Sequence, residues 1–178
     1  AVSDTRRQEL AALLGLPPGD VIAEMLARCR VMAAAVERGL RDPEPGLRLL
    51  APSAGQVFAA ETANRLAVGG LHTRAAARAL AVMHVNAGGG VVCAAPTAGS
   101  AGGGPAVAVT LAEELGVDEG RLALGLLAAG AVGVVIATRA TFAAEVAGCQ
   151  VEIGAAGAMA AAAVVEAAGG AAAQAADA

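Results

Sequence analysis

The sequence predicts an all-α fold in a single helical domain, and three observations support this prediction. Apolar residues recur at helical spacing through most of the chain. No segment alternates polar residues with β-branched or aromatic ones, as a half-buried strand does. Hydrophobic residues make up 57% of the 178 residues, yet only two are aromatic and 24 are glycine. With so few large side chains, we expect the helices to pack closely through alanine and glycine surfaces, around a glycine-rich central loop.

The first half of the chain predicts four helices, separated by turns rich in proline and glycine. They are expected over residues 4–15, 20–39, 54–68 and 71–85. Cys29 lies on the apolar face of the second of these helices, which places it in the core. Arg74 and Arg78 on the fourth are most simply explained as part of a solvated face.

The second half of the chain predicts a glycine-rich loop followed by apolar helices. From Asn86 onward, 22 residues contain seven glycines and two prolines, and the run VVCAA at their centre fits either a strand or buried extended chain. The later helices are expected over residues 105–115, 118–137, 155–168 and 171–178. The helix 118–137 is apolar all round, so we expect it to run through the centre. A membrane span is the alternative, but the uncharged stretch is short and weakly hydrophobic for one.

Charge and cysteine content exclude several classes of function. The net charge is −4, all twelve basic residues are arginine, and they form no basic run, so nucleic-acid binding is disfavoured. Three cysteines lie far apart without a CxxC pair, which argues against a disulfide framework and a local zinc site. The charged, amphipathic start of the chain is unlike a signal peptide. We therefore expect a cytoplasmic protein without nucleic-acid or membrane partners.

Cys149 stands in an unusual polar setting between Glu145 and Glu152. On one helix, these spacings would place all three side chains on the same face. Their neighbours are alanine, glycine and valine, so we expect a packed, low-dielectric site in which the groups are paired, protonated or bound to metal. The alternative is a buried structural cysteine whose neighbouring carboxylates face solvent.

The segment PTAGSAGGGPA, residues 96–106, is a glycine-rich loop that leads into a helix. Free backbone N–H groups and the helix dipole favour an anion at such a position, and Thr97 and Ser100 add hydroxyl donors. A nucleotide-binding P-loop would need a lysine, and the chain has none. A small carboxylate is therefore the expected anion, and a flexible connector between helices is the alternative.

Three segments taken in order resemble a known family. NAGGGVVCAAPTAGSAGG, LLAAGAVGVVIATRATF and GCQVEIGAAGAMAAAAVVEAAGG closely resemble the α chain of the iron–sulfur-dependent L-serine dehydratases, with a likeness that covers residues 25–178. This resemblance implies conversion of L-serine to pyruvate and ammonia with a [4Fe–4S] cluster in place of pyridoxal phosphate. The absence of lysine agrees with that, because a pyridoxal enzyme needs a lysine for its Schiff base. In the family, an open iron of the cluster acts as Lewis acid on the substrate hydroxyl while a base removes the Cα proton.

The resemblance also implies roles for particular residues and partners. Cys149 matches the first of three cluster ligands in the family, and the other two belong to a segment expected after residue 178. Residues 1–178 are accordingly interpreted as one α-chain domain, truncated at its C-terminus, with an incomplete ligand set. The substrate carboxylate is expected at Thr97, Gly99 and Ser100, with Asn86 close by. A separate β chain or a fused β domain is the expected partner, and a homo-oligomer is compatible with the sequence.

Two points stay open at this stage. The general base is not assigned, because His72 and His84 are the only histidines and neither carries a further signal of catalysis. A noncatalytic α-helical fragment or paralogue, binding a small carboxylate without a cluster, is the alternative function.

Overall fold

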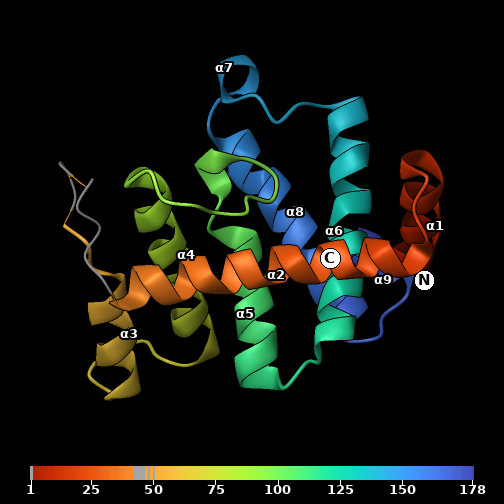
Figure 1. Ribbon diagram of the computed structural model, residues 1–178. Helices are drawn as coiled ribbons and strands as arrows, with labels where there is room; N and C mark the ends of the chain where they lie inside the picture. The colour runs from red at the N-terminus through yellow and green to blue at the C-terminus, as the bar shows by residue number, and fades with distance from the viewer. Residues whose placement is uncertain (1, 42–46, 48, 50) are drawn as a thin grey trace.

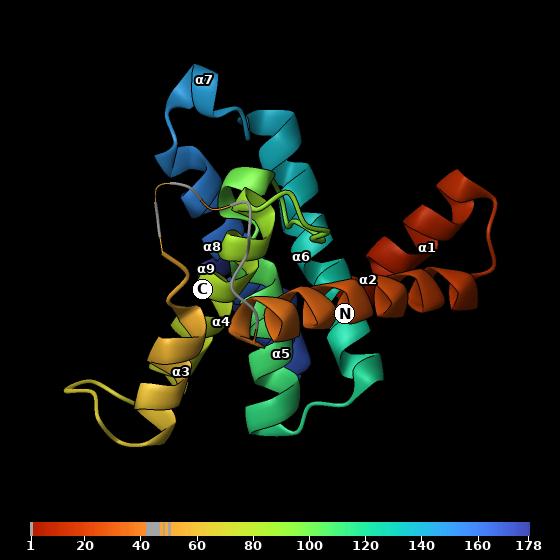
Figure 2. The ribbon, with the colours of Figure 1, turned by 60° about the vertical axis from the view of Figure 1, so that its left-hand side comes forward.

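Nine α-helices and one 3₁₀ turn make up the computed structural model, which describes residues 2–41, 47, 49 and 51–178 (Figures 1 and 2). No strand occurs in this part of the chain, so the all-α prediction is confirmed. In chain order, the elements are α1 (Val2–Leu14), α2 (Pro18–Arg41), α3 (Ala54–Thr62), α4 (Leu71–Ala87), η1 (Ala98–Ser100), α5 (Gly103–Leu115), α6 (Glu119–Arg139), α7 (Ala144–Ala147), α8 (Gln150–Ala167) and α9 (Ala172–Asp177).

Helix α2 runs across the other long helices, as Figure 1 shows. It packs against α1, α3, α4, α5 and α6, while α6 packs most extensively against α8. Most of the buried residues of α6 lie in its first half, whereas its second half exposes Val134 and Val135. The expectation that this helix runs through the centre is therefore right for its first half only.

Close packing between helices depends on glycine, as the composition predicts. A Cβ atom at Gly39 of α2 would overlap the carbonyl oxygen of Ala81 on α4. A Cβ atom at Gly102 would lie 2.5 Å from the carbonyl oxygen of Ala79, also on α4. These glycines let the backbones touch directly, which compensates for the lack of large core side chains.

Two helix boundaries differ by five residues or more from those expected, and the others by one or two residues at most. Helix α3 ends at Thr62 instead of residue 68, because Asn64 adopts a left-handed conformation with φ of 53°. Asparagine tolerates this conformation better than most residues, and the N–H group of Arg65 closes the helix end on the carbonyl of Ala60. Helix α8 begins at Gln150, five residues before its expected start. The run 91–95 forms neither helix nor strand, which rules out the strand alternative for it, and Val91 is exposed.

Arg78 is the largest fully buried side chain, with 1% of its surface exposed, so the expectation of a solvated face was wrong for it. Its guanidinium donates to Thr110 Oγ1 at 3.0 Å, Glu113 Oε2 at 2.7 Å and Glu114 Oε1 at 2.8 Å. It also lies 5.2 Å from the ring centroid of Phe58 on α3. Helical periodicity alone could not reveal this burial, because the carboxylates that pair with Arg78 come from α5.

Arg74, one turn before Arg78, extends the same ion-pair network. It donates to Glu61 of α3 at 2.8 Å and to Glu114 of α5 at 2.9 Å. The pKa of Glu61 is lowered by a hydrogen bond from the N–H of Gly70 and by Arg74, and the pKa of Glu114 is lowered by Arg74 and Arg78. The network therefore ties α3, α4 and α5 together through charged groups.

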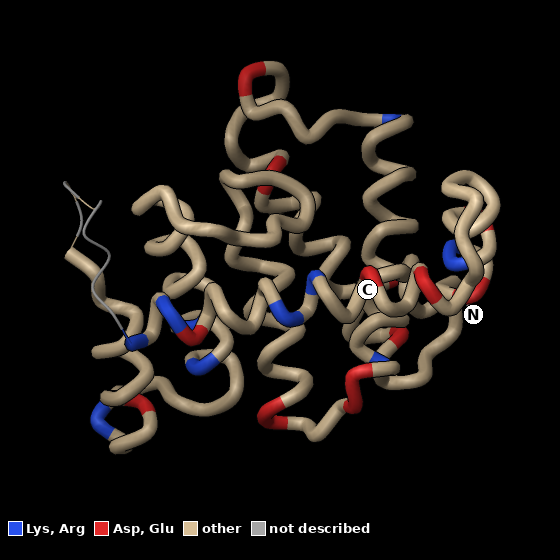
Figure 3. The backbone as a smooth tube through the Cα atoms, viewed as in Figure 1, with Lys and Arg blue, Asp and Glu red and all other residues tan. Residues whose placement is uncertain are grey.

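In the part of the chain that the structure describes, two helices, α6 and α8, are long and apolar enough to cross a membrane by length and composition. The bent pair α1 and α2 would add a third span only if the two helices, which meet at 104°, were taken together. In this structure α6 and α8 pack mainly against each other, and acidic and basic residues are interspersed along the chain (Figure 3). The absence of a membrane partner stays a prediction.

Candidate functional site

The glycine-rich loop closes onto the first turn of α8. Thr97 Oγ1 donates a short hydrogen bond to Glu152 Oε1, with 2.6 Å between the two atoms, and so joins residues 55 positions apart. Gly99 packs against the same carboxylate, since a Cβ atom there would lie 2.6 Å from Glu152 Cδ. A larger residue at position 99 would therefore require the Glu152 side chain to move.

The two hydroxyl groups of the loop form a directed chain of hydrogen bonds. Thr97 Oγ1 and Ser100 Oγ are 3.2 Å apart. Thr97 has one hydroxyl hydrogen, and that hydrogen is given to Glu152, so Ser100 must be the donor in this second bond. Ser100 is also buried. Neither hydroxyl therefore has a hydrogen left for an external anion in this state.

Asn86 joins the same cluster from the last turn of α4. Its Nδ2 atom donates to the carbonyl oxygen of Ala98 at 3.0 Å, which leaves one amide N–H free by this count. The structure thus brings together all four residues predicted to bind the substrate: Asn86, Thr97, Gly99 and Ser100. It adds Glu152, which the sequence pattern associates with Cys149 and not with the loop.

Cys149 lies at the surface, at the N-cap position of α8. Helix α7 ends just before it, at Gly148, whose positive φ of 84° turns the chain. Glu145 and Cys149 therefore lie on different elements, and the predicted common face of Glu145, Cys149 and Glu152 is wrong. The low-dielectric setting predicted for the thiol is wrong too, because Cys149 is exposed.

The other two cysteines lie elsewhere and are half-buried. Cys29 packs beside the cluster of Leu111, Leu122 and Ala167, as its apolar helix face predicts. Burial, with a smaller contribution from Cys93, raises the pKa of Cys29 to about 11, and burial raises the pKa of Cys93. Within the described residues, no three His, Cys, Asp or Glu side chains converge to hold a metal ion.

The histidines lie apart from the loop. His84 is 4% exposed and its Nδ1 atom has no hydrogen-bond partner. Residues two apart on a helix point about 200° apart, so His84 faces away from the side on which Asn86 meets the loop. His72 is exposed in the first turn of α4, at the opposite end of that helix from Asn86. The structure gives neither histidine a position from which to act as a base at the loop.

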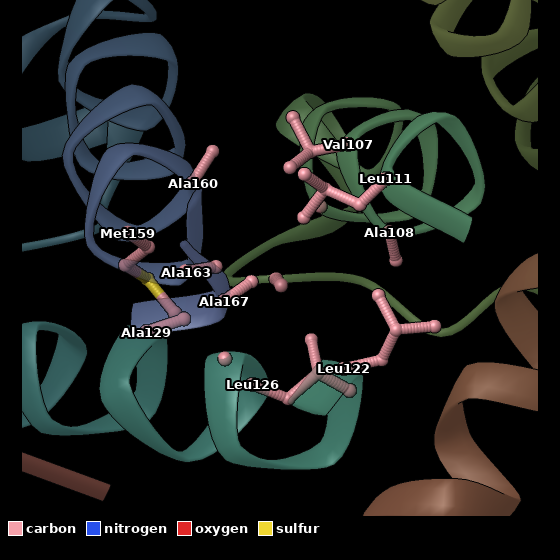
Figure 4. Close-up of a pocket in the computed structure, with 13 residues that line it drawn as sticks. Val107, Ala108, Leu111, Leu122, Leu126, Ala129, Met159, Ala160, Ala163 and Ala167 are labelled. Atoms are coloured by element: carbon pink, nitrogen blue, oxygen red, sulfur yellow. The ribbon is translucent and has the colours of Figure 1, made fainter. Parts of the chain in front are cut away.

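An apolar cavity lies between α5, α6 and α8, and Figure 4 shows side chains from all three helices facing it. The space open to the centre of a water-sized sphere is about 20 Å³, enough for a single water molecule. The lining offers no polar side chain: Ala95, Gly104, Val107, Ala108, Leu111, Leu122, Gly125, Leu126, Ala129, Met159, Ala160, Ala163 and Ala167. Such a cavity is a packing defect, and it has neither the volume nor the donors for an amino acid.

The comparisons with known proteins that gave a match all assign the chain to the same family. The family model described as "Serine dehydratase alpha chain" matches residues 3–178. The chain is 38% identical to the "Probable L-serine dehydratase, alpha chain" of Bacillus subtilis (strain 168) over 145 residues, which are 82% of this chain and 48% of that protein. It is 44% identical to the "L-serine dehydratase, alpha chain" of Peptoniphilus asaccharolyticus over 97 residues, 54% of this chain and 33% of that one. The chain thus spans about half, or less, of the length of these relatives. No solved structure matches it.

Proposed function

Because this chain belongs to the serine dehydratase alpha chain family, we propose that it is part of an L-serine dehydratase, which converts L-serine to pyruvate and ammonia. The observation that carries the proposal is the family match over residues 3–178, combined with a loop that closes onto the helix bearing Cys149 at its start. The relatives' names supply the substrate, and the loop supplies a site of suitable polarity for it.

Asn86, Thr97, Gly99 and Ser100 are proposed to form the substrate-binding site, with the carboxylate of L-serine at the loop. Asn86 retains one amide N–H, and backbone N–H groups that begin a helical turn lack intrahelical partners. Both kinds of donor suit a carboxylate. Thr97 and Ser100 use their hydroxyl hydrogens within the site, so their part is to hold the loop in shape.

The proposed cofactor is the [4Fe–4S] cluster that the family resemblance implies. Such clusters are held by several cysteine thiolates, whereas the described residues place one exposed cysteine, Cys149, beside the first turn of α8. The residues present therefore do not form a complete ligand set. We propose that Cys149 supplies one ligand and that the others come from a part of the protein outside the described residues.

The proposed partner is a β chain or a fused β domain, because the relatives are named as alpha chains. A homo-oligomer and a cytoplasmic location belong to the same proposal. Copurification of a second chain from the native source would test the partner.

The test of this function uses the intact protein that contains this chain, purified and reconstituted with iron and sulfide without oxygen. We expect brown protein that forms pyruvate from L-serine. Cys149→Ser should remove the visible absorbance and the bound iron along with activity, because a thiolate ligand is lost. Cys29→Ser and Cys93→Ser are the matched controls and should keep all three properties. Full iron content and normal turnover in Cys149→Ser would contradict the ligand assignment.

A second candidate is a noncatalytic chain that binds a small carboxylate without a cluster. The incomplete ligand set of the described residues favours it. Binding of L-serine by the intact protein, with neither iron nor pyruvate formation after reconstitution, would support this candidate over the enzyme.

A further inference from the structure

We propose that Glu152 recognises the ammonium group of the amino-acid substrate, so that the loop distinguishes L-serine from a hydroxy acid of the same size. This inference rests on the proposed function, because it deepens the role of the same loop. It places Glu152 in the substrate-binding site, whereas the sequence pattern grouped this residue with Cys149.

Glu152 is a half-buried carboxylate without a cationic partner among the described residues. Among the other glutamates that are not exposed, Glu61 and Glu114 are both paired with Arg74, while Glu166 accepts a hydrogen bond from the hydroxyl of Ser3. Glu152 instead accepts a hydrogen bond from a neutral hydroxyl, that of Thr97. A carboxylate that is partly removed from water is stabilised by an opposite charge, and here the substrate can supply it.

The two hydroxyl hydrogen bonds of the loop run toward this carboxylate. Ser100 donates to Thr97, and Thr97 donates to Glu152, so the chain ends at an acceptor. Charge-assisted hydrogen bonds of this kind are strong and hold the acceptor in one orientation. The loop therefore presents an oriented negative group, which suits a cation and repels a carboxylate placed at the same point.

Gly99 is an exposed residue that lies against this carboxylate, since a Cβ atom there would lie 2.6 Å from Glu152 Cδ. Glu152 itself is half-buried and so keeps part of its surface in contact with solvent. The ammonium and carboxylate groups of L-serine are attached to the same carbon. An ammonium group at Glu152 would therefore place the substrate carboxylate beside the neighbouring loop N–H groups and the free N–H of Asn86.

The experiment titrates the ¹⁵N-labelled chain with three probes and follows the amide signals of residues 97–100 and 152. The probes are L-serine, ethanolamine (which lacks the carboxylate) and 3-hydroxypropanoate (which lacks the ammonium). We expect L-serine to shift these signals at lower concentration than 3-hydroxypropanoate does. Glu152→Gln should weaken binding of L-serine and of ethanolamine by about tenfold or more, because one hydrogen bond between charged groups is lost. It should leave binding of 3-hydroxypropanoate unchanged.

Three further variants separate recognition of the substrate from effects on the structure of the loop. Glu145→Gln removes an exposed carboxylate from the neighbouring helix α7 and should change nothing. Thr97→Val should weaken binding of L-serine by removing the group that orients Glu152, while Thr97→Ser keeps the hydroxyl and should restore it. Well-dispersed spectra identify the variants that fold.

The outcomes distinguish this inference from the proposed function. If L-serine binds the loop equally well in Glu152→Gln, or if that variant binds 3-hydroxypropanoate more tightly than the unaltered chain does, Glu152 is not the ammonium site. Tighter binding of 3-hydroxypropanoate by Glu152→Gln would mean that Glu152 lies where the substrate carboxylate binds. If none of the three probes shifts the signals of residues 97–100, the loop is not the substrate site and the binding assignment of the proposed function is overturned as well.

Discussion

The three cysteines sit in different environments, and their chemistry should differ accordingly. Cys149 is exposed, whereas Cys29 is half-buried with a pKa of about 11, against an ordinary value of 9.0. At pH 8, a two-unit rise lowers the thiolate fraction by about 100-fold, and the thiolate is the reactive form. We expect a thiol-reactive disulfide reagent to label Cys149 first and Cys29 far more slowly, as absorbance of the released thiolate will show. Persistence of the fast phase in Cys149→Ser would contradict this order.

At the residue scale, the sequence predicted the spatial cluster of Asn86, Thr97, Gly99 and Ser100 better than it predicted the partners of Cys149. Thr97, Gly99 and Ser100 are neighbours in the chain, so one loop brings them together whatever the rest of the fold does. The contact of Thr97 with Glu152 crosses 55 residues and depends on how α8 packs, which no local pattern contains. The separation of Glu145 from Cys149 depends on the single positive φ of Gly148.

At the element scale, two helical glycines should respond in opposite ways to substitution by alanine. A Cβ atom at Gly39 would overlap the carbonyl of Ala81, while one at Gly157 would meet nothing within 4 Å. Gly39→Ala should destabilise the protein by about 3 kcal/mol, because two helix backbones must separate. Gly157→Ala should stabilise it by about 0.5–1 kcal/mol, because alanine loses less conformational freedom in a helix. Urea unfolding followed by circular dichroism measures both, and equal changes would refute the close-contact interpretation.

The ion-pair network between α3, α4 and α5 should make the fold sensitive to acid. Glu61 and Glu114 have pKa values below the ordinary 4.5, so their stabilising contribution is complete above pH 4.5 and is lost as the pH falls through their lower folded-state values. The urea concentration at which half of the protein is unfolded should therefore decrease as the pH is lowered below 4.5. Arg74→Met, which removes a partner of both carboxylates, should flatten that dependence. Arg28→Met removes an exposed pair with Glu24 and serves as the control.

Helix existence was easier to predict than helix ends. Long apolar periodic segments identified every helix from α1 to α6, because the period survives small errors in the boundaries. The end of α3 depends on the left-handed Asn64, and the start of α8 follows the turn at Gly148. Each of these boundaries depends on the backbone conformation of a single residue, which the spacing of apolar residues does not reveal.

At the scale of the whole molecule, the apolar character of α6 and α8 raises the question of a membrane. We expect the chain to remain in the supernatant after ultracentrifugation without detergent, because α6 and α8 pack mainly against each other, with 33% of the most apolar stretch of each helix buried. Charged residues are also spread along the remaining chain (Figure 3). Sedimentation with membranes, reversed only by detergent, would show that the two helices insert.

The hydrogen bond between Thr97 and Glu152 also bears on the order in which the molecule folds. Helices form from local contacts on short timescales, whereas a contact across 55 residues must wait until the intervening chain has been arranged. Helices α5 and α6 lie in that interval, and α6 packs against α8. We therefore expect the loop to acquire its native shape only after α8 has docked on α6. The residues proposed to bind the substrate should consequently be among the last parts of the chain to become ordered during folding.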